Sequence, residues 1–260
     1  MNTAKTLSDN RSREVGAEDL EGFYGAEGAL KLWDDKAAWQ LRAAYEGSFY
    51  KDILRQDGAK RVIDIAAASG FHAIALSQAG FSVTATDGLA AFVQAGILNQ
   101  IETKTNFPFL HLPWSALTPQ TFGETPFDAA LCLGGSLHHT NQAGVLEMFS
   151  NISSILRRGG LFVVEQRNYE KLFAERPKTM THPCGWTYNL TFVEPYTIGF
   201  HLVDTKRSLD VRCECIATFE RELLLIAKRA GFGIKATFFD HGKTHERTNA
   251  SWIEFIFEAN

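Results

Sequence analysis

Apolar and polar positions first follow a helical pattern. Between Leu30 and Tyr45 the apolar residues recur every three or four positions, which is the period of an α-helix. A second helix is expected over residues 48–56, because the Asp57-Gly58 pair that follows suits a helix C-terminus. The polar residues 1–22, which mix charges of both signs, predict a loose tail before this region.

From Arg61 onward, short β-branched or aromatic runs alternate with helical stretches. Strands are predicted over 61–65, 81–86, 107–112, 127–133 and 161–165, with helices over 71–79, 90–103 and 145–156. This alternation with short links is typical of a mostly parallel sheet that is covered by helices on both faces. Such sheets bind their ligands at the carboxyl ends of the strands.

The pattern changes after Tyr169. Segments 187–193, 197–204 and 208–218 alternate loosely, which predicts an antiparallel meander before a last helix over 220–230. Two final strands, 234–239 and 252–257, have a connector that is too short for a crossover helix and should pair antiparallel. The predicted fold class is α/β. A seven-stranded, mostly parallel sheet with one reversed strand fills a domain over 23–260, and the antiparallel insertion at 187–218 lies within it.

Composition and charge narrow the function classes. Hydrophobic residues make up 45% of the chain and charged residues 22%, which is typical of a globular protein. The formal net charge is −4, whereas proteins that bind the nucleic-acid backbone usually have an excess of basic residues. None of the four cysteines lies in a Cys-x-x-Cys pair, so a four-thiolate zinc site has no support. No apolar stretch approaches the length of a membrane span, and the first residues show no apolar region behind basic residues of the kind that predicts a secretory leader. We therefore expect a cytoplasmic protein that binds neither nucleic acid nor membrane.

The turn after the first predicted strand carries the candidate chemistry. Its small residues, Ala66 to Gly70, let the backbone approach a ligand closely, and Asp87 at the end of the second strand can accept hydrogen bonds from ribose hydroxyls. Phe71 stands where a dinucleotide-binding turn needs a small residue, so the turn suits a ligand without phosphates better. A tight strand-to-helix link without a ligand is the alternative for the turn taken alone.

Several further motifs occur in order along the chain. They are Tyr24 with Trp33, Val62-Ile63-Asp64-Ile65-Ala66, Gly80-Phe81-Ser82-Val83-Thr84, Phe127-Asp128-Ala129, Cys132-Leu133-Gly134 with Ser136 and His139, and Arg158-Gly159-Gly160 running into Arg167-Asn168-Tyr169. Together they resemble the class I S-adenosylmethionine-dependent methyltransferases, and more narrowly the glycine N-methyltransferase branch. The resemblance, which is strongest over about residues 20–170, implies a Rossmann-like fold and S-adenosylmethionine as the cofactor. It also implies methyl transfer to the amine nitrogen of a small, carboxylate-bearing metabolite or amino acid.

The resemblance implies a cofactor site as well. Its residues are Trp33, Arg42, Ala66, Ala68, Gly70, Asp87, Gly88, Leu89, Pro113, Trp114, Ser115, Leu133 and Gly134. In this interpretation Asp87 holds the ribose and Trp114 is the flat wall beside adenine. Arg42 is a candidate partner for the methionine carboxylate, with a solvated surface arginine as the alternative.

The resemblance makes Arg167 the substrate anchor, since a fork of N–H donors suits a carboxylate. Tyr24, His139 and Tyr169 complete the predicted catalytic set. The aromatic residues Trp186, Tyr188 and Phe192 of the meander are placed over the substrate. Attack by a neutral amine on the sulfonium methyl needs alignment and desolvation rather than a dedicated general base.

His138 and His139 form an adjacent pair of potential metal ligands. No nearby carboxylate or thiol in the sequence completes a site, so no metal is expected.

The chain departs from the family pattern at three places. Ala68 replaces a glycine, which costs on the order of 1 kcal/mol if that residue has a positive φ. Gly135 replaces an asparagine and is expected to open space, and Cys213-Glu214-Cys215 stands where glycine-methylating members have tyrosines. These departures keep two alternatives open: an O- or C-methyltransferase of a larger metabolite, and a catalytically inactive binding subunit. A homo-oligomer also stays open, whereas Phe71 disfavours a nicotinamide reductase.

Overall fold

Seven strands form the main sheet, in the order β10-β11-β5-β4-β1-β2-β3. Their bounds are Arg61–Asp64 (β1), Ser82–Asp87 (β2), Phe109–His111 (β3), Phe127–Cys132 (β4), Leu156–Arg167 (β5), Phe232–Phe239 (β10) and Trp252–Ala259 (β11). The computed structural model describes residues 17–25, 28–123, 125–181, 186–193 and 195–260. Strand β11 runs antiparallel to both of its neighbours, while the other pairs are parallel. The predicted seven-stranded sheet with one reversed strand is confirmed.

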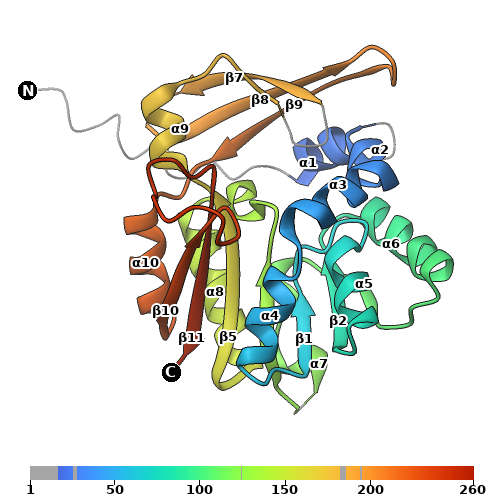
Figure 1. The fold of residues 1–260 in the computed structure, drawn as a ribbon, viewed down its shortest axis with the longest axis vertical. Helices are drawn as coiled ribbons and strands as arrows, with labels where there is room; N and C mark the ends of the chain where they lie inside the picture. The colour runs from blue at the N-terminus through green and yellow to red at the C-terminus, as the bar shows by residue number, and fades with distance from the viewer. Residues whose placement is uncertain (1–16, 26–27, 124, 182–185, 194) are drawn as a thin grey trace, which may run out of the picture.

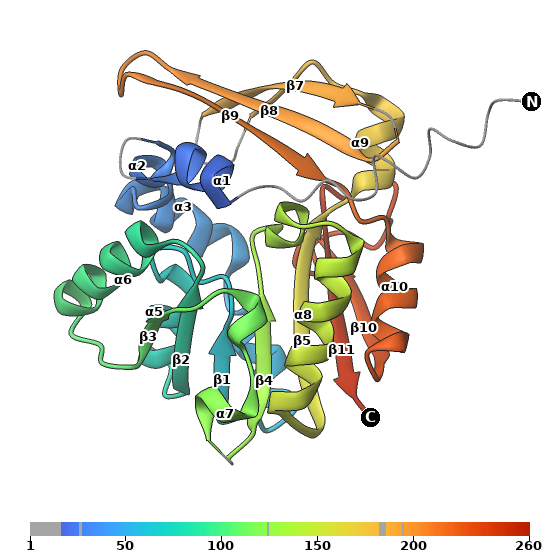
Figure 2. The same cartoon turned by 180° about the vertical axis from the view of Figure 1, so that it is seen from behind.

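Helices cover both faces of this sheet. One face carries α4 (Phe49–Gln56), α5 (Phe71–Gln78) and α6 (Ala90–Thr103), and the other carries α7 (Pro119–Phe122), α8 (Gln142–Ile155) and α10 (Glu220–Arg229), as Figures 1 and 2 show from opposite sides. Side chains of successive strand residues point to opposite faces. In β4, Ala129 and Leu131 therefore pack on the α5 side, while Ala130 and Cys132 pack on the α8 side.

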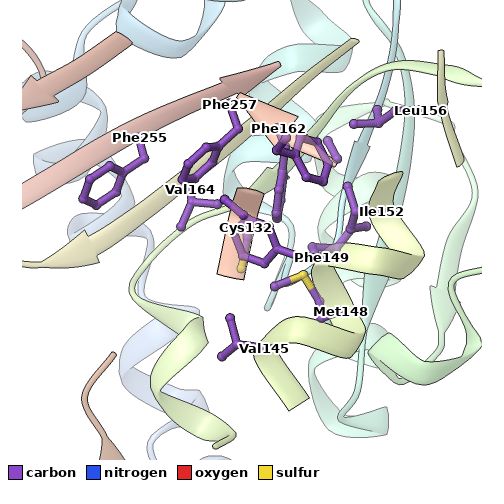
Figure 3. Packing of buried hydrophobic residues seen from close by; sticks show 14 of the residues in the cluster. Cys132, Val145, Met148, Phe149, Ile152, Leu156, Phe162, Val164, Phe255 and Phe257 are labelled. Carbon is purple, nitrogen blue, oxygen red and sulfur yellow. The ribbon is translucent and has the colours of Figure 1, made fainter. Parts of the chain in front are cut away.

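The core on the α8 side is rich in phenylalanine (Figure 3). Val145, Met148, Phe149 and Ile152 recur at helical spacing along α8, and all four are fully buried. The ring of Phe149 lies 4.9 Å from that of Phe162 on β5, measured between centroids. Burial of each such side chain stabilises the fold by about 1.5–3 kcal/mol, so this layer holds α8 against the strands whose ends form the site.

A second sheet lies across the carboxyl end of the main sheet (Figure 1). It has four antiparallel strands in sequence order, namely β6 (Thr179–Thr181), β7 (Thr187–Val193), β8 (Thr197–Asp204) and β9 (Leu209–Ile216). Helix α9 (Tyr169–Glu175) joins it to β5. The predicted meander is therefore present with nearly the predicted bounds. Strand β6 is additional, because three residues are too short for an alternation to be recognised.

The N-terminal region is folded against this second sheet. Helices α1 (Ala17–Tyr24), α2 (Leu30–Trp33) and α3 (Lys36–Glu46) lie beside it, and Phe23 is buried in one cluster with Trp186 and Phe200. The predicted tail over 1–22 is thus too long: residues 17–22 are helical, because the apolar face of α1 packs on β9. The rest of that prediction, residues 1–16, lies outside the described residues.

Smaller differences concern the ends of elements. Strand β3 covers Phe109–His111 rather than 107–112, and β5 begins at Leu156 rather than Leu161. Across the part of the chain that the structure describes, no helix combines the length and apolarity that crossing a membrane requires.

Candidate active site

A cavity of about 400 Å³ lies where the carboxyl ends of the parallel strands meet the second sheet and the N-terminal helices. Most of the predicted site residues line it. They are Tyr24, Trp33, Arg42, Ala66, Ala68, Asp87, Gly88, Leu89, Pro113, Trp114, Leu133, Gly134, His139 and Arg167. The structure therefore brings together, from helices α1 to α3 and five strand ends, side chains that are far apart in the sequence.

Three predicted site residues do not line the cavity. Gly70 begins helix α5 with a φ of 93°, and Phe109 and Ile74 fill the space beside it. Ser115 is exposed on the short helix η1 (Trp114–Ala116), next to the wall that Trp114 provides. Tyr169 is buried behind the cavity, where its hydroxyl lies 3.0 Å from Nδ1 of His138. Its placement among the residues that contact a substrate is thus wrong, and it instead orients His138.

The turn after β1 is tied to the end of β2 through Asp87. One carboxylate oxygen of Asp87 accepts a 2.9 Å hydrogen bond from the Ala68 N–H, and the other accepts a 2.9 Å bond from the Leu89 N–H. Burial raises the pKa of Asp87, although these two bonds oppose the rise. Each oxygen keeps acceptor capacity for a hydroxyl group. Ala68 has a φ of 46°, so the strained conformation that the sequence suggested is present.

Trp114 forms a fixed wall of the cavity. Its indole N–H donates a 2.8 Å hydrogen bond to the Ile65 carbonyl at the end of β1, which fixes the orientation of the ring. The rings of Trp33 and Trp186, which also line the cavity, lie 5.2 Å apart. The cavity therefore offers aromatic surface on which a planar group can pack.

A buried network of charges surrounds Arg42. Its guanidinium forms an ion pair with Glu46 one turn later on α3 and lies 3.7 Å from Oε2 of Glu165 at the end of β5. The same Glu165 oxygen accepts a 2.6 Å hydrogen bond from the Gly134 N–H, and His241 lies 2.9 Å from the other oxygen. Burial opposes the charge on Arg42, but the two carboxylates raise its pKa above the ordinary value. Arg42 is therefore held by two acids, rather than standing as a solvated surface arginine.

Sequence reasoning missed the acids of this network. Glu46 carried a signal, because it lies four residues after Arg42 on one helical face. Glu165 carried a weaker signal, as an acid at the carboxyl end of a buried strand. His241 comes from the turn between β10 and β11 and has no local signal, since only the tertiary fold brings it to Glu165.

Arg167 stands at the end of β5 against an aromatic ring. Its guanidinium carbon lies 4.3 Å from the centre of the Trp252 ring. Among the described residues, none provides Arg167 with a hydrogen bond or an ion pair. Partial burial lowers its pKa, although nearby groups that include Tyr169 and Glu165 oppose this shift. The half-buried guanidinium lines the cavity.

The ring of Trp252 also corrects the expectation for Gly135. A Cβ built at Gly135 would lie 3.3 Å from the Trp252 ring and 3.5 Å from His138. The missing side chain therefore opens no space for a substrate, because Trp252 occupies it. Because Gly135 has no side chain, the Trp252 ring, over which the Arg167 guanidinium lies, can approach the loop after β4.

The second sheet closes the cavity with an apolar surface. Trp186, Tyr188 and Phe200 are buried there, and the Trp186 indole donates a 2.9 Å hydrogen bond to the Tyr188 hydroxyl. Phe192, which was predicted beside them, does not line the cavity. Its ring packs on Phe173 of α9, 5.4 Å away, because it lies four residues after Tyr188 and near the far end of β7.

Two thiols complete this wall. Cys213 and Cys215, on β9, line the cavity with their sulfurs 3.9 Å apart. One ring nitrogen each from His138 and His139 lies within 4.8 Å of the Cys215 sulfur. The prediction that no thiol lies near the histidine pair is wrong, because the meander folds back over the loop after β4.

Comparison with known proteins is consistent with this arrangement. A family model described as a methyltransferase domain matches residues 62–160. The glycine/sarcosine N-methyltransferase of Aphanothece halophytica is 32% identical over 186 residues, covering 70% of this chain and 69% of the relative. That of Halorhodospira halochloris is 32% identical over 145 residues, covering 55% and 53%. Human glycine N-methyltransferase is 30% identical over 178 residues, covering 63% and 60%. The match thus spans between half and about two thirds of these relatives.

Solved structures share the fold. An S-adenosylmethionine-dependent methyltransferase from Clostridium acetobutylicum gives a TM-score of 0.71 at 14% identity, over 83% of this chain and 91% of that one. The glycopeptide N-methyltransferase MtfA, in complex with S-adenosylmethionine, gives 0.59 at 13% identity, over 83% and 94%. Fold, cavity and relatives define a class I methyltransferase that uses S-adenosylmethionine as its cofactor. Within that class, the chain belongs to the family that includes the glycine/sarcosine N-methyltransferases.

Proposed function

We propose that this enzyme methylates the amine nitrogen of a small metabolite that bears a carboxylate, such as an amino acid. The observation that carries this proposal is Arg167, a half-buried guanidinium without an ion pair to an acid among the described residues, at the edge of an aromatic cavity. A partly desolvated charge is stabilised by a counter-charge, and a carboxylate matches the fork of its N–H donors. The names of the relatives, which specify glycine and sarcosine, support the same substrate class.

The residues that line the cavity support a proposal for how the cofactor binds. We assign Asp87 to the ribose hydroxyls, Trp114 to the adenine face and Arg42 to the methionine carboxylate. The fit is supported by the acceptor capacity of Asp87, by the fixed indole of Trp114 and by the half-buried cation of Arg42. When bound, S-adenosylmethionine supplies a methyl group on a positively charged sulfur.

The residues on the acceptor side exclude water and hold the amine. Burial raises the pKa of the Tyr24 phenol, which therefore stays protonated, and its oxygen lies 3.0 Å from Nε2 of His139. The other nitrogen of His139, Nδ1, is buried and has no hydrogen-bond partner. It can accept a proton from the incoming ammonium group, which leaves the neutral amine that attack requires. Trp186 and Tyr188 keep the surroundings dry.

The acceptor is proposed to be larger than glycine. Trp186, Phe200 and the two cysteines of β9 present apolar surface beyond Arg167. An apolar side chain on the amino acid would cover this surface, whereas glycine would leave it bare.

Two separate experiments test the cofactor-binding role of Asp87 and the carboxylate-binding role of Arg167. Calorimetry with S-adenosylmethionine is expected to show at least tenfold weaker binding to Asp87→Ala than to the wild type, because the ribose loses its acceptors. Equal affinity would refute the cofactor assignment.

The anchor is tested on a panel of amino acids and of matched amines that lack the carboxylate. Arg167→Ala and Arg167→Lys are expected to raise KM for the amino acids by tenfold or more, because neither offers the planar fork. KM for the decarboxylated amines is the control and should change little. If the amino acids are unaffected, the carboxylate anchor is wrong; product analysis by NMR shows whether nitrogen, oxygen or carbon is methylated.

A further inference from the structure

Three nitrogen and sulfur donors meet at one wall of the cavity, and a second thiol lies beside them. His138 and His139 belong to the short helix η2 (Ser136–His139), which contacts β9, the strand that carries Cys213 and Cys215. One nitrogen of each histidine and the Cys215 sulfur lie within 4.8 Å of one another, and the Cys213 sulfur is 3.9 Å from that of Cys215. We propose that these four side chains form a Cys₂His₂ site for a zinc ion.

The spacing of the sulfurs agrees with tetrahedral zinc. Two Zn–S bonds of about 2.3 Å at the tetrahedral angle separate the sulfurs by about 3.8 Å, close to the 3.9 Å between Cys213 and Cys215. A sulfur and a nitrogen on the same ion are about 3.6 Å apart. The histidine nitrogens, within 4.8 Å of the Cys215 sulfur, therefore need to approach that sulfur by at most about 1.2 Å.

Each histidine has one ring nitrogen beside a tyrosine hydroxyl, which leaves its other nitrogen available to a metal. The Tyr24 hydroxyl lies 3.0 Å from Nε2 of His139, and the Tyr169 hydroxyl lies 3.0 Å from Nδ1 of His138. In zinc sites the nitrogen that is not bound to the metal donates to an oxygen in this way, which fixes the tautomer and the ring.

A second observation points to a ligand at this place. The 3.9 Å contact between the sulfurs is also what a thiol–thiol hydrogen bond gives, so it does not select for metal by itself. Nδ1 of His139, however, is buried without a hydrogen-bond partner, and such an atom is rare unless something else binds it.

The local charge is compatible with a cation. Arg167 lines the same cavity and opposes a positive ion. Two thiolates neutralise a divalent ion, so the occupied site carries no net charge.

An ion at this wall would exclude the methyl acceptor. That consequence rests on the function proposed above, whereas binding of the ion does not. Zinc would thus act as an inhibitor that competes with the acceptor, and not as a structural ion of the core.

The experiment measures metal binding without cofactor or acceptor. Reduced, metal-free full-length protein is titrated with Zn²⁺ by calorimetry and with Co²⁺ by absorption spectroscopy. We expect one ion per chain and, with Co²⁺, thiolate-to-metal charge-transfer and tetrahedral ligand-field bands. Cys215→Ala is expected to weaken binding of Zn²⁺ by at least tenfold and to weaken the charge-transfer band. Cys132→Ala, at a buried thiol outside the cavity, is the matched control and should leave both unchanged.

Two results would overturn the site. One is equal affinity of the wild type and Cys215→Ala for Zn²⁺, and the other is a Co²⁺ spectrum without a charge-transfer band. Circular dichroism checks that each variant is folded. If Cys215→Ala is not, Cys213→Ala provides the same comparison. If the wild type binds zinc but transfers no methyl group to any acceptor of the panel, that result would count against the proposed function and not against the zinc site.

Discussion

At the residue scale, the turn after β1 shows how a ligand-binding backbone accepts local strain. Ala68 takes a φ of 46°, which a side chain with a Cβ adopts at a cost. Its N–H donates to Asp87, and this bond keeps the turn against the end of β2. Ala67, the preceding residue, is buried and has no positive φ. Of these two neighbouring alanines, Ala68 therefore has a backbone conformation that favours glycine, whereas Ala67 does not.

This contrast gives a paired prediction. Ala68→Gly is expected to raise the free energy of unfolding by about 1 kcal/mol, because glycine adopts a positive φ without the Cβ penalty. Ala67→Gly is expected to lower it by about 1 kcal/mol, through lost packing and a more flexible unfolded chain. Urea denaturation of the three proteins measures both changes. Destabilisation by both substitutions would mean that the Ala68 Cβ makes contacts worth more than the strain.

At the element scale, Glu165 connects parts of the fold that the sequence separates. It stands near the end of β5, accepts from Gly134 after β4, faces Arg42 of α3 and binds His241 of the β10–β11 turn. Burial would raise the pKa of Glu165, but its bond to His241 and the charge of Arg42 lower it below the usual value. The carboxylate is therefore charged and holds three elements around the proposed methionine end of the cofactor.

Removal of this charge should be costly. Glu165→Gln keeps an acceptor for Gly134 but leaves Arg42 and His241 with one acid fewer, so the free energy of unfolding is expected to fall by about 3 kcal/mol. Chemical denaturation measures the change. Glu258→Gln, which breaks an exposed pair with Lys235, is the control, and we expect less than about 1 kcal/mol. Equal effects of the two substitutions would contradict a structural role for the Glu165 network.

At the scale of the whole molecule, the packed interior holds titratable groups next to the site. Glu254 of β11 is fully buried, and burial raises its pKa to about 8, although the nearby His241 opposes the rise. The folded protein therefore keeps this proton at neutral pH, whereas the unfolded chain releases it near the ordinary value of 4.5. The contribution of the Glu254 proton to the free energy of unfolding is therefore complete at low pH and is lost as the pH rises towards 8.

The pH dependence can be measured directly. Between about pH 5 and pH 8 the Tm of the wild type is expected to fall as pH rises, because the unfolded state binds fewer protons than the folded state. Glu254→Gln mimics the protonated carboxyl and should flatten this decline. Some slope should remain, since Glu165 raises the pKa of His241 against its burial, and the charge of His241 also stabilises the fold only at lower pH. Identical profiles for the two proteins would contradict the assignment.

The sequence by itself determined the architecture of this protein. The strands could be placed because β-branched runs and helical periods are local signals, and the short connector between the last two strands required an antiparallel pair. The positions of Asp87 and Arg167 could be predicted too, because the carboxyl ends of parallel strands meet at one edge.

Only the tertiary structure decided the contacts between distant segments. The Cys215 thiol of β9 lies near His139 because the meander folds back over the loop after β4. Trp252 fills the space beside Gly135 because β11 pairs with β5. No local pattern encodes these neighbours. These contacts form when the two sheets pack, because the free energy of packing depends on the total apolar surface that is buried and not on any single pair of residues.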